Sequence, residues 1–480
     1  MTQNPADDPL AIPAEFSDTL ALQQAAYRRQ MNPTLAERRA DLLTLHRMLV
    51  ENSETLVEAV NRDFGCRCKF ETRFTEIFLN QDAILATVKQ LKKWLKPQKR
   101  HLDPTQYPLA SAWTFPQPVG VVGIVVPWNF PIAMAITPLI GIFAAGNRAM
   151  IKMSENSNHL AAAFREISPR YFPLDKLAFF EDGGGRGPAF TSLPFDHLFF
   201  TGSPATAKAV MANAARNLTP VTLELGGKSP CVVAPDYPVR TAAERILWAK
   251  MLNAGQICTN VDYLFLPEDK VEAFITEARA IFNARIPDIN NGDYTSIIDQ
   301  RSYDRLQATV ADAAAKGARI VDLYTGPAPD ATRRLLPTRI VVGVSDDMEI
   351  MQREIFGPLL PIRTYQTREE VVRYVGERPR PLAFYIYSND RALQDYYLNN
   401  TISGGVGINE SVVQAGIHDL PFGGSGNSGM GHYHGYEGFL AVSKLRPVFK
   451  QGPLRVLSLF HPPYRGLPAR LLAFMQKWKS

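Results

Sequence analysis

The sequence predicts an α/β protein with two domains, each built on a parallel sheet covered by helices. Val119 to Val126 is an apolar run rich in β-branched residues, which is typical of a fully buried strand in a parallel sheet. Strand-like and helix-like segments alternate after it, and a second alternating region runs from Cys231 to about Thr401. Because 480 residues exceed the usual size of one domain, we expect two domains that face each other across a cleft.

The first hundred residues are predicted to be mainly helical. Thr34 followed by Glu37 has the pattern of a capping box, in which each side chain bonds the backbone N–H of the other residue at a helix start. Apolar residues then recur at helical spacing. We expect a helix from Leu35 onward, a second from Ser53 toward Asp63, and a third from Glu76 to Leu95.

The segments after this helical region are predicted to form a parallel sheet with helices on both faces. The apolar stretch from Val119 to Ala145 is long enough for a membrane span, but prolines and an asparagine interrupt it, so we interpret it as a buried strand, a turn and a buried helix. The other expected strands are Arg148–Met153, Leu177–Glu181, His197–Phe200 and Val221–Leu225, and the expected helices are Asn158–Ile167 and Thr206–Arg216.

The composition argues against nucleic-acid binding, a disulfide framework and a metal centre. The 52 basic and 47 acidic residues leave a small excess, and the body of the chain has no basic run with interleaved aromatics. Cys66, Cys68, Cys231 and Cys258 are too few and too irregular for a disulfide or zinc framework, so we expect reduced thiols. Residues 1–16 lack the features of a signal peptide, and we expect a cytoplasmic protein.

Two short segments indicate covalent catalysis at an acyl carbon. Glu224 lies in Thr222–Pro230, and Cys258 ends the segment Asn253–Cys258 about one helix further on. A thiolate is a strong nucleophile, and a carboxylate nearby can take its proton or activate the water that clears an acyl-enzyme. Each residue alone also has an ordinary explanation, because free cysteines are often buried and a carboxylate at a strand end can bond backbone N–H groups.

Both segments resemble the signature sequences of the NAD(P)-dependent aldehyde dehydrogenase family, and five further motifs follow the family order over most of the chain. The resemblance implies the aldehyde dehydrogenase fold and the oxidation of an aldehyde to a carboxylic acid. The five motifs are Pro127-Trp128-Asn129-Phe130-Pro131, Lys152-Met153-Ser154-Glu155, Phe200-Thr201-Gly202-Ser203, Glu354-Ile355-Phe356-Gly357-Pro358 and the glycine-rich run from Leu420 to Gly431.

The resemblance assigns three residues to the chemistry. Cys258 would attack the aldehyde carbon, and the Asn129 side-chain amide together with the Cys258 backbone N–H would bind the oxyanion of the thiohemiacetal. After loss of hydride, Glu224 would activate the water that hydrolyses the thioester. Without the family, Asn129 is better explained as a turn residue. A non-catalytic protein on an inherited fold is the alternative, which the intact catalytic positions oppose.

The cofactor site lacks the Gly-Xaa-Gly-Xaa-Xaa-Gly pattern of a dinucleotide fold. Gly202 and Ser203 precede a helix, where free N–H groups can hold a phosphate, although an ordinary turn capped by Ser203 fits equally well. The resemblance favours the pyrophosphate and implies that Lys152 and Glu155 meet the adenosine ribose. Because a carboxylate there repels a 2′-phosphate, we expect NAD, with NADP as the alternative. Spacing alone also allows Lys152 and Glu155 to be a solvated surface pair.

Three more positions are expected at the nicotinamide end of the cofactor. The resemblance implies that Glu354 holds the nicotinamide ribose, that Phe356 lies beside the ring, and that Trp128 belongs to the same binding site. Arg353 departs from the family pattern, in which a second glutamate usually precedes the position of Glu354. An arginine beside this site adds positive charge, and its effect stays open at this point.

The resemblance also predicts the domains and the assembly. Residues 17–97 and 117–226 would form the NAD-binding domain, residues 227–417 the catalytic domain, and residues 98–116 and 431–480 an oligomerisation arm and C-terminal tail, so we expect a homodimer. From Leu454 to Ser480, leucines and aromatics interleave with basic residues as in a helix that lies on a membrane surface. Packing of this tail on a partner subunit is the alternative that we favour.

The predicted substrate is an aromatic aldehyde. His432–Gly435 and Asn217–Thr222 resemble the class 3 branch of the family, whereas Asn253–Gln256 and Lys152–Asn156 resemble its bacterial coniferyl aldehyde dehydrogenases. This implies coniferaldehyde or a similar compound. A medium- or long-chain aldehyde is the alternative, which the amphipathic tail favours. A coenzyme A-acylating enzyme is a further alternative, but that branch typically has no glutamate at the position of Glu224.

Overall fold

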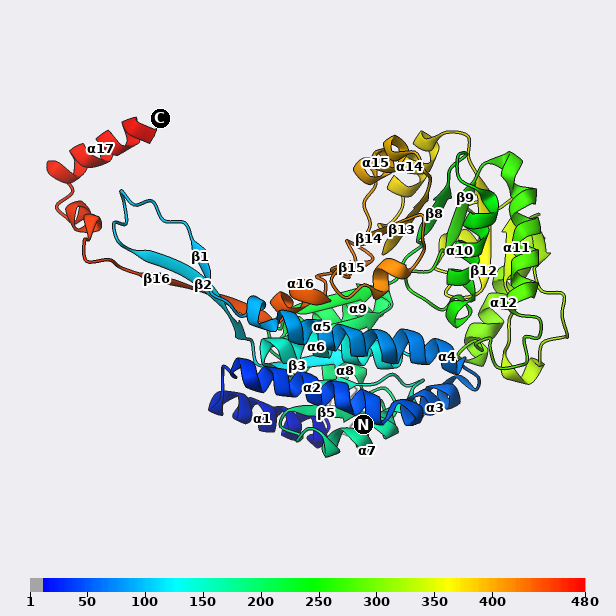
Figure 1. The fold of residues 1–480 in the computed structure, drawn as a ribbon, viewed down its shortest axis with the longest axis horizontal. Helices are drawn as coiled ribbons and strands as arrows, with labels where there is room; N and C mark the ends of the chain where they lie inside the picture. Colours follow the sequence, from blue (N-terminus) through cyan, green and yellow to red (C-terminus); the bar gives the residue numbers. More distant parts are fainter. Residues whose placement is uncertain (1–11, 480) are drawn as a thin grey trace, which may run out of the picture.

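Three sheets organise the chain, as the ribbon shows (Figure 1). The structure is a computed structural model that describes residues 12–479, and the predicted lack of a signal peptide falls mainly on residues 1–11, which lie outside the described part. A six-stranded and a seven-stranded sheet each carry their own helices, and a small three-stranded sheet projects away from both. The predicted α/β class is therefore confirmed.

The six-stranded sheet has the order β15-β7-β6-β3-β4-β5 and is parallel except where β15 joins β7. All strands predicted from Val119 to Leu225 form, within two residues of their expected ends. From β3 the chain adds β4 and β5 on one side of that strand. It then crosses back and adds β6 and β7 on the other side of β3. The strands are β3 (Val121–Val125), β4 (Arg148–Lys152), β5 (Leu177–Phe180), β6 (His197–Gly202), β7 (Val221–Leu225) and β15 (Gly429–Met430).

Helices cover both faces of this sheet, because successive strand residues point into two separate apolar clusters. On β4, Ile151 belongs to the cluster under α2, α3, α5, α6, α7 and α16, whereas Met150 belongs to the cluster under α1, α8 and α9. These helices are α1 (Ala14–Arg29), α2 (Leu35–Glu51), α3 (Ser53–Phe64), α5 (Leu79–Trp94), α6 (Pro131–Ala145), α7 (Asn158–Ile167), α8 (Gly187–Thr191), α9 (Pro204–Ala215) and α16 (Gly435–Ala441).

The capping box at the start of α2 is confirmed, whereas α1 is an element that the sequence analysis did not predict. Thr34 Oγ1 accepts the N–H of Glu37 at 3.3 Å, and the Glu37 carboxylate accepts the N–H of Thr34 at 2.7 Å. The buried face of α1 includes the polar Gln23, which weakens its apolar pattern. In the fold this amide donates to the carbonyl of Ala149 at 2.9 Å, so a distant strand satisfies it.

The third predicted helix begins earlier than expected. It was predicted to start at Glu76, but α4 (Lys69–Thr72), the π-helical turn η2 (Arg73–Phe78) and α5 follow one another without a break. A π-helical turn widens the helix locally and shifts the residues that follow it around the axis. The 3.6-residue period is therefore interrupted at this turn. For that reason the apolar pattern did not predict the part of the helix before Glu76.

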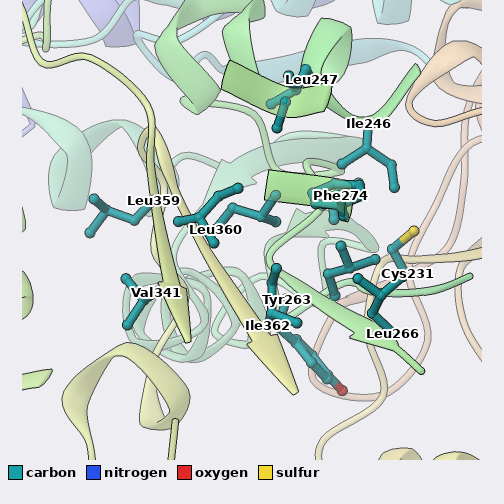
Figure 2. Packing of buried hydrophobic residues seen from close by; sticks show 14 of the residues in the cluster. Cys231, Ile246, Leu247, Tyr263, Leu266, Phe274, Val341, Leu359, Leu360 and Ile362 are labelled. Atoms are coloured by element: carbon teal, nitrogen blue, oxygen red, sulfur yellow. The ribbon is translucent and has the colours of Figure 1, made fainter. Parts of the chain in front are cut away.

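The seven-stranded sheet has the order β10-β11-β12-β9-β8-β13-β14 and is parallel except at β10. Figure 2 shows side chains of β8, β9, β11 and β12 gathered with those of α10 and α11 in its core, where Cys231 is fully buried. The strands are β8 (Pro230–Val233), β9 (Tyr263–Leu266), β10 (Arg319–Asp322), β11 (Arg339–Val342), β12 (Leu359–Thr364), β13 (Ala383–Tyr387) and β14 (Gly405–Ile408). The helices are α10 (Val239–Met251), α11 (Val271–Arg285), α12 (Gln300–Ala315), α13 (Glu349–Gln352), α14 (Arg368–Gly376) and α15 (Arg391–Asn400).

The three-stranded sheet projects from the body and carries the C-terminal helix at its far end (Figure 1). Its strands β1 (Gln98–Arg100), β2 (Ser111–Pro118) and β16 (Ser443–Lys450) are antiparallel, and α17 (Leu467–Lys479) follows them. Within residues 12–479, no helix is both long enough and apolar enough to cross a membrane.

A fully buried ion pair fastens the N-terminal helices to the loop after β3. Arg67 Nη2 lies 3.2 Å from Glu76 Oε1, and neither side chain is exposed. Glu76 Oε2 accepts the N–H groups of Ile132 at 2.8 Å and Ala133 at 3.1 Å, in the first turn of α6. Arg67 Nη1 donates to the carbonyl of Asn129 at 2.5 Å. The pair therefore fixes the path of the chain between β3 and α6.

Replacing Glu76 with Ala should destabilise the fold strongly. The substitution leaves the Arg67 guanidinium without its partner inside the protein, which typically costs about 3–5 kcal/mol. The midpoint of urea unfolding, followed by circular dichroism, measures this loss. The matched control is Glu54→Ala, which removes an exposed ion pair with Arg73 and should leave the midpoint unchanged. Equal midpoints in the two variants would contradict the assigned role of Glu76.

Candidate active site

The predicted site residues gather where the two large sheets meet. The carboxyl ends of β3, β6 and β7 lie on one edge of the six-stranded sheet, because these strands are parallel and paired in register. The reversal of strand order between β3 and β6 marks the usual ligand-binding position of such sheets. Asn129 follows β3, Ser203 follows β6, and Glu224 lies near the end of β7.

One cavity of about 560 Å³ brings most of these residues together, and its wall is mainly apolar. Cys258 reaches it from the connection between α10 and β9, so the second sheet contributes the thiol. Lys152 and Glu155 are not part of its wall. The predicted residues that line it are Trp128, Asn129, Gly202, Ser203, Glu224, Cys258, Glu354 and Phe356.

Lys152 and Glu155 have different surroundings at the end of β4. Lys152 is buried, and its Nζ lies 2.5 Å from Asp182 Oδ1. Glu155 is exposed and accepts a hydrogen bond from Ser154 Oγ at 3.1 Å. The alternative of a solvated surface pair is therefore wrong for Lys152. The exposed carboxylate of Glu155 stays accessible to a ligand that carries hydroxyl groups.

Ser203 is the N-cap of α9. Its Oγ accepts the N–H of Thr206 at 3.2 Å, as the ordinary capping interpretation expected. A helix start also carries partial positive charge and free N–H groups, so the same geometry suits a phosphate. At Gly202 a Cβ would come within 2.6 Å of the Phe200 ring, which explains why no larger residue stands before this cap.

A strained turn carries Cys258. In the turn η4 (Leu252–Gly255), Asn253, Ala254 and Gly255 are all left-handed, with φ of 51°, 49° and 73°. A residue other than glycine in this region costs about 1–3 kcal/mol, so the surroundings must hold the turn. One such contact is the hydrogen bond from Asn253 Nδ2 to the carbonyl of Asn129 at 3.0 Å.

Glu71 also holds this turn, although the sequence analysis did not identify it. Its Oε2 accepts the N–H of Asn253 at 3.1 Å and the hydroxyl of Thr295 at 2.8 Å. Burial raises the pKa of Glu71 to about 7. The sequence analysis did not identify Arg67 either. Both Arg67 and Glu71 bond backbone groups that are distant in the sequence. The one signal in the sequence that could have pointed to them is the density of charged residues between Arg67 and Glu76.

The side-chain amide of Asn129 is directed at the nucleophile turn. Its Nδ2 donates to the carbonyl of Gln256 at 3.2 Å. The backbone carbonyl of Asn129 accepts hydrogen bonds from Arg67 and Asn253, so two side chains hold its backbone. An amide nitrogen carries two N–H groups, and one of them is left for a ligand in the cavity.

The cavity holds a thiol and two carboxylates in mainly apolar surroundings. Both oxygens of Glu224 are buried and accept no hydrogen bond from residues 12–479. Burial raises the pKa of Glu224 well above its ordinary value. Burial, together with the charges of the nearby Glu354 and Glu224, raises the pKa of Cys258 to about 12. The thiol is therefore protonated at neutral pH in this state.

Glu354 and Phe356 enter the cavity from the connection between α13 and β12. Burial raises the pKa of Glu354 to about 8, and its Oε1 accepts no hydrogen bond from the described residues. At Gly226 any Cβ would collide with the Glu354 carboxylate, so the glycine makes room for it. The rings of Phe356 and Trp128 meet edge to face, with centroids 5.4 Å apart.

Arg353 does not line the cavity, although it precedes Glu354. Its Nη2 lies 2.6 Å from Glu349 Oε2. Its carbonyl accepts a hydrogen bond from Lys228 Nζ at 3.0 Å. Lys228 also pairs with Asp262, so this lysine fixes the connection that carries Glu354. The departure from the family pattern thus places a charge beside the site and not inside it.

The residues fit a nicotinamide dinucleotide. The start of α9 offers N–H groups and the Ser203 hydroxyl to a pyrophosphate. Glu354 Oε1 is a buried acceptor without a partner among the described residues, which suits a ribose hydroxyl. Trp128 and Phe356 supply aromatic surface beside it. Within residues 12–479, no group of three or more His, Cys, Asp or Glu side chains could hold a metal ion.

The ligand site lies where the strand order of the parallel sheet reverses, and the adjoining cavity contains Cys258. This combination is typical of oxidoreductases that use a dinucleotide and a thiol. The chain matches the aldehyde dehydrogenase family over residues 7–448 and belongs to that family. It is therefore an oxidoreductase that acts on aldehydes, as the sequence analysis predicted. The class 3 resemblance is confirmed as well, because a family 3 aldehyde dehydrogenase of Dictyostelium discoideum is among the similar proteins.

Three similar proteins illustrate the relationship. A probable coniferyl aldehyde dehydrogenase of Pseudomonas aeruginosa is 44% identical, with 92% of each chain covered. A coniferyl aldehyde dehydrogenase of Pseudomonas sp. strain HR199 is 42% identical, with 87% of each chain covered. Among solved structures, the substrate-bound state of Staphylococcus aureus AldH matches with a TM-score of 0.89 at 32% identity, over 96% of this chain and 99% of that one.

Alkylation of Cys258 should be slow at neutral pH and should accelerate as the pH rises. Because its pKa is raised to about 12, the thiolate fraction grows roughly tenfold per pH unit below that value. Iodoacetamide labelling between pH 7 and 10, followed by mass spectrometry, measures the rate. Because the pKa of Glu354 is about 8, Glu354→Gln removes a negative neighbour above that pH, so it should lower the pKa of Cys258 and speed the labelling between pH 8 and 10.

The control is Cys258→Ser, which should abolish the labelled peptide, because the other three cysteines are buried. A labelling rate that stays constant from pH 7 to 10 would mean that the thiolate already forms in the free enzyme, contrary to this electrostatic account.

Proposed function

We propose that the enzyme oxidises coniferaldehyde, or a similar aromatic aldehyde, to the carboxylic acid with NAD. The observation that carries the proposal is a mainly apolar cavity in which Cys258 and Glu224 lie together. Such a wall suits a substrate that is apolar apart from its reacting end. Two relatives named for coniferyl aldehyde oxidation, at 42% and 44% identity, support the aromatic class.

The first step is the attack of Cys258 on the aldehyde carbon. The thiol gives its proton to Glu224, a carboxylate whose charge raises the pKa of the thiol, and Glu224 releases this proton to solvent before the second step. A sulfur–carbon bond forms, and the aldehyde oxygen gains negative charge. The free N–H of Asn129 and the backbone N–H of Cys258 receive this charge, and such a donor is typically worth about 3 kcal/mol.

The thioester step depends on Glu224. A bound nicotinamide dinucleotide supplies the hydride acceptor for the oxidation of the thiohemiacetal. Glu224 then takes a proton from the water that attacks the acyl carbon, the carbon–sulfur bond breaks, and the acid leaves. Because burial raises the pKa of Glu224, its basic form becomes more abundant as the pH rises. Hydrolysis should therefore become faster toward alkaline pH.

The cofactor assignment rests on residues along the sheet edge. Gly202 and Ser203 would hold the pyrophosphate at the start of α9, and Glu354 would hold the nicotinamide ribose. The exposed carboxylate of Glu155 accepts the hydroxyls of the adenosine ribose and repels a 2′-phosphate, which favours NAD over NADP. The buried pair of Lys152 with Asp182 supports the adjoining end of β4.

The domain assignment follows the sheets. Residues 17–97 and 117–226 bind the dinucleotide, and residues 227–417 provide the nucleophile. Residues 98–116 and 431–480 form an arm and a tail, although β15 and α16 return to the six-stranded sheet unit. The four free thiols suit a reducing compartment such as the cytoplasm.

We propose a homodimer in which the tail packs on the partner. The tail exposes large apolar side chains, among them Leu467, Phe474 and Trp478, and α17 buries none of its residues in the single chain. Such a surface is normally covered in solution. Light scattering of the full chain gives the oligomer size, and binding of the dimer to liposomes would favour the membrane alternative instead.

Cys258→Ala and Glu224→Gln should separate the two chemical steps. Cys258→Ala should abolish oxidation while NAD binding, measured by calorimetry, remains. Glu224→Gln should slow hydrolysis more than acylation, so that stopped-flow absorbance shows a burst of NADH near one equivalent per site, followed by slow turnover. Unchanged steady-state turnover in Glu224→Gln would mean that another base acts on the thioester.

The substrate class can be tested by NADH formation at 340 nm with coniferaldehyde, benzaldehyde, hexanal and dodecanal. We expect the highest kcat/KM with coniferaldehyde, because the apolar cavity and the coniferyl relatives favour an aromatic substrate. A rise with chain length would favour a medium- or long-chain aldehyde dehydrogenase. Added coenzyme A should not change the rate, because Glu224 is present to activate water.

A further inference from the structure

Phe70, Phe74 and Phe78 form a stacked row on the exposed side of the continuous helix made by α4 and η2. The ring centroids of Phe70 and Phe74 are 6.5 Å apart, and those of Phe74 and Phe78 are 6.2 Å apart, with 14° between the planes in each pair. Their exposed fractions are 74%, 40% and 56%. Exposed aromatic rows of this kind need an explanation, because each ring leaves apolar surface in water.

Only the middle ring of the row reaches the cavity. Phe74 lines the wall that also contains Cys258, whereas Phe70 and Phe78 do not. The π-helical turn η2 spans Phe74 and Phe78, and its wider turn brings residues four apart almost above each other, so the rings stack. The row therefore presents a single ring, that of Phe74, to the cavity.

A second partly exposed aromatic ring belongs to the same wall. Trp248 on α10 lines the cavity and is 37% exposed, which is close to the exposure of Phe74. The two rings come from the two large sheet units, η2 on one side and α10 on the other. Since both line the cavity and both reach solvent, they lie at its opening.

We propose that Phe74 and Trp248 form an aromatic rim that selects aldehydes with a flat aromatic ring at some distance from the reacting carbon. This deepens the proposed function and rests on it. Flat rings gain from offset or edge-on contact with other rings beyond the area that they bury, whereas a saturated ring of the same size gains only the area.

The test compares two substrates that share the reacting enal. trans-Cinnamaldehyde carries an aromatic ring and 3-cyclohexylpropenal a saturated ring of the same size, so the ratio of their kcat/KM values isolates the contribution of aromaticity. In Phe74→Leu and Trp248→Leu this ratio should fall about two- to tenfold, mainly through KM. Leucine keeps the wall apolar and removes only the ring.

Phe70→Leu is the matched control, since it belongs to the same row but does not line the cavity. Its ratio should stay within twofold of the wild-type value. Equal losses with both substrates in Phe74→Leu, or the same fall in Phe70→Leu, would overturn the aromatic rim.

The wild-type enzyme separates this inference from the proposed function. If it oxidises both enals and the ratio is unchanged in Phe74→Leu and Trp248→Leu, the rim assignment fails while aldehyde oxidation stands. If the wild type oxidises only saturated chains such as dodecanal, the aromatic substrate class fails, and the rim fails with it.

Discussion

The buried ion pair of Arg67 and Glu76 is the interaction on which the arrangement of the site depends. Two charges inside a protein are costly unless they are paired, and here the pair also bonds the start of α6 and the carbonyl of Asn129. That loop in turn accepts a bond from Asn253, beside the nucleophile. The N-terminal helices, which carry none of the predicted chemistry, thereby set the position of the oxyanion donor against the thiol.

The nucleophile turn shows why such support is needed. Three successive left-handed residues, two of them not glycine, do not persist unless neighbouring groups hold them. Glu71 and Asn129 bond one side of the turn, and the backbone of Gly357 lies so close to Gly255 that no Cβ fits between them. Contacts from both sheet units therefore hold this turn.

The apolar wall of the cavity has a cost and a benefit. It keeps the Cys258 thiol protonated at neutral pH and raises the pKa of Glu224, because burial disfavours both charged forms. The same low polarity strengthens every hydrogen bond to an oxyanion that forms beside Asn129. The low polarity of the wall thus has two effects. It keeps the thiol protonated in the resting enzyme, and it strengthens the binding of the oxyanion during the reaction.

The sequence by itself determined the family, the strands of the first sheet and the residue types of the site, because ordered motifs and apolar runs are local patterns. It could not place α1, whose buried Gln23 depends on a distant carbonyl, or the π-helical start of the third helix, which breaks the helical period. Nor could it find Arg67 and Glu71, because their partners lie far along the chain and only burial makes them important. Tertiary structure alone decided which residues share the cavity, since a contact between two sheet units has no counterpart in a local pattern.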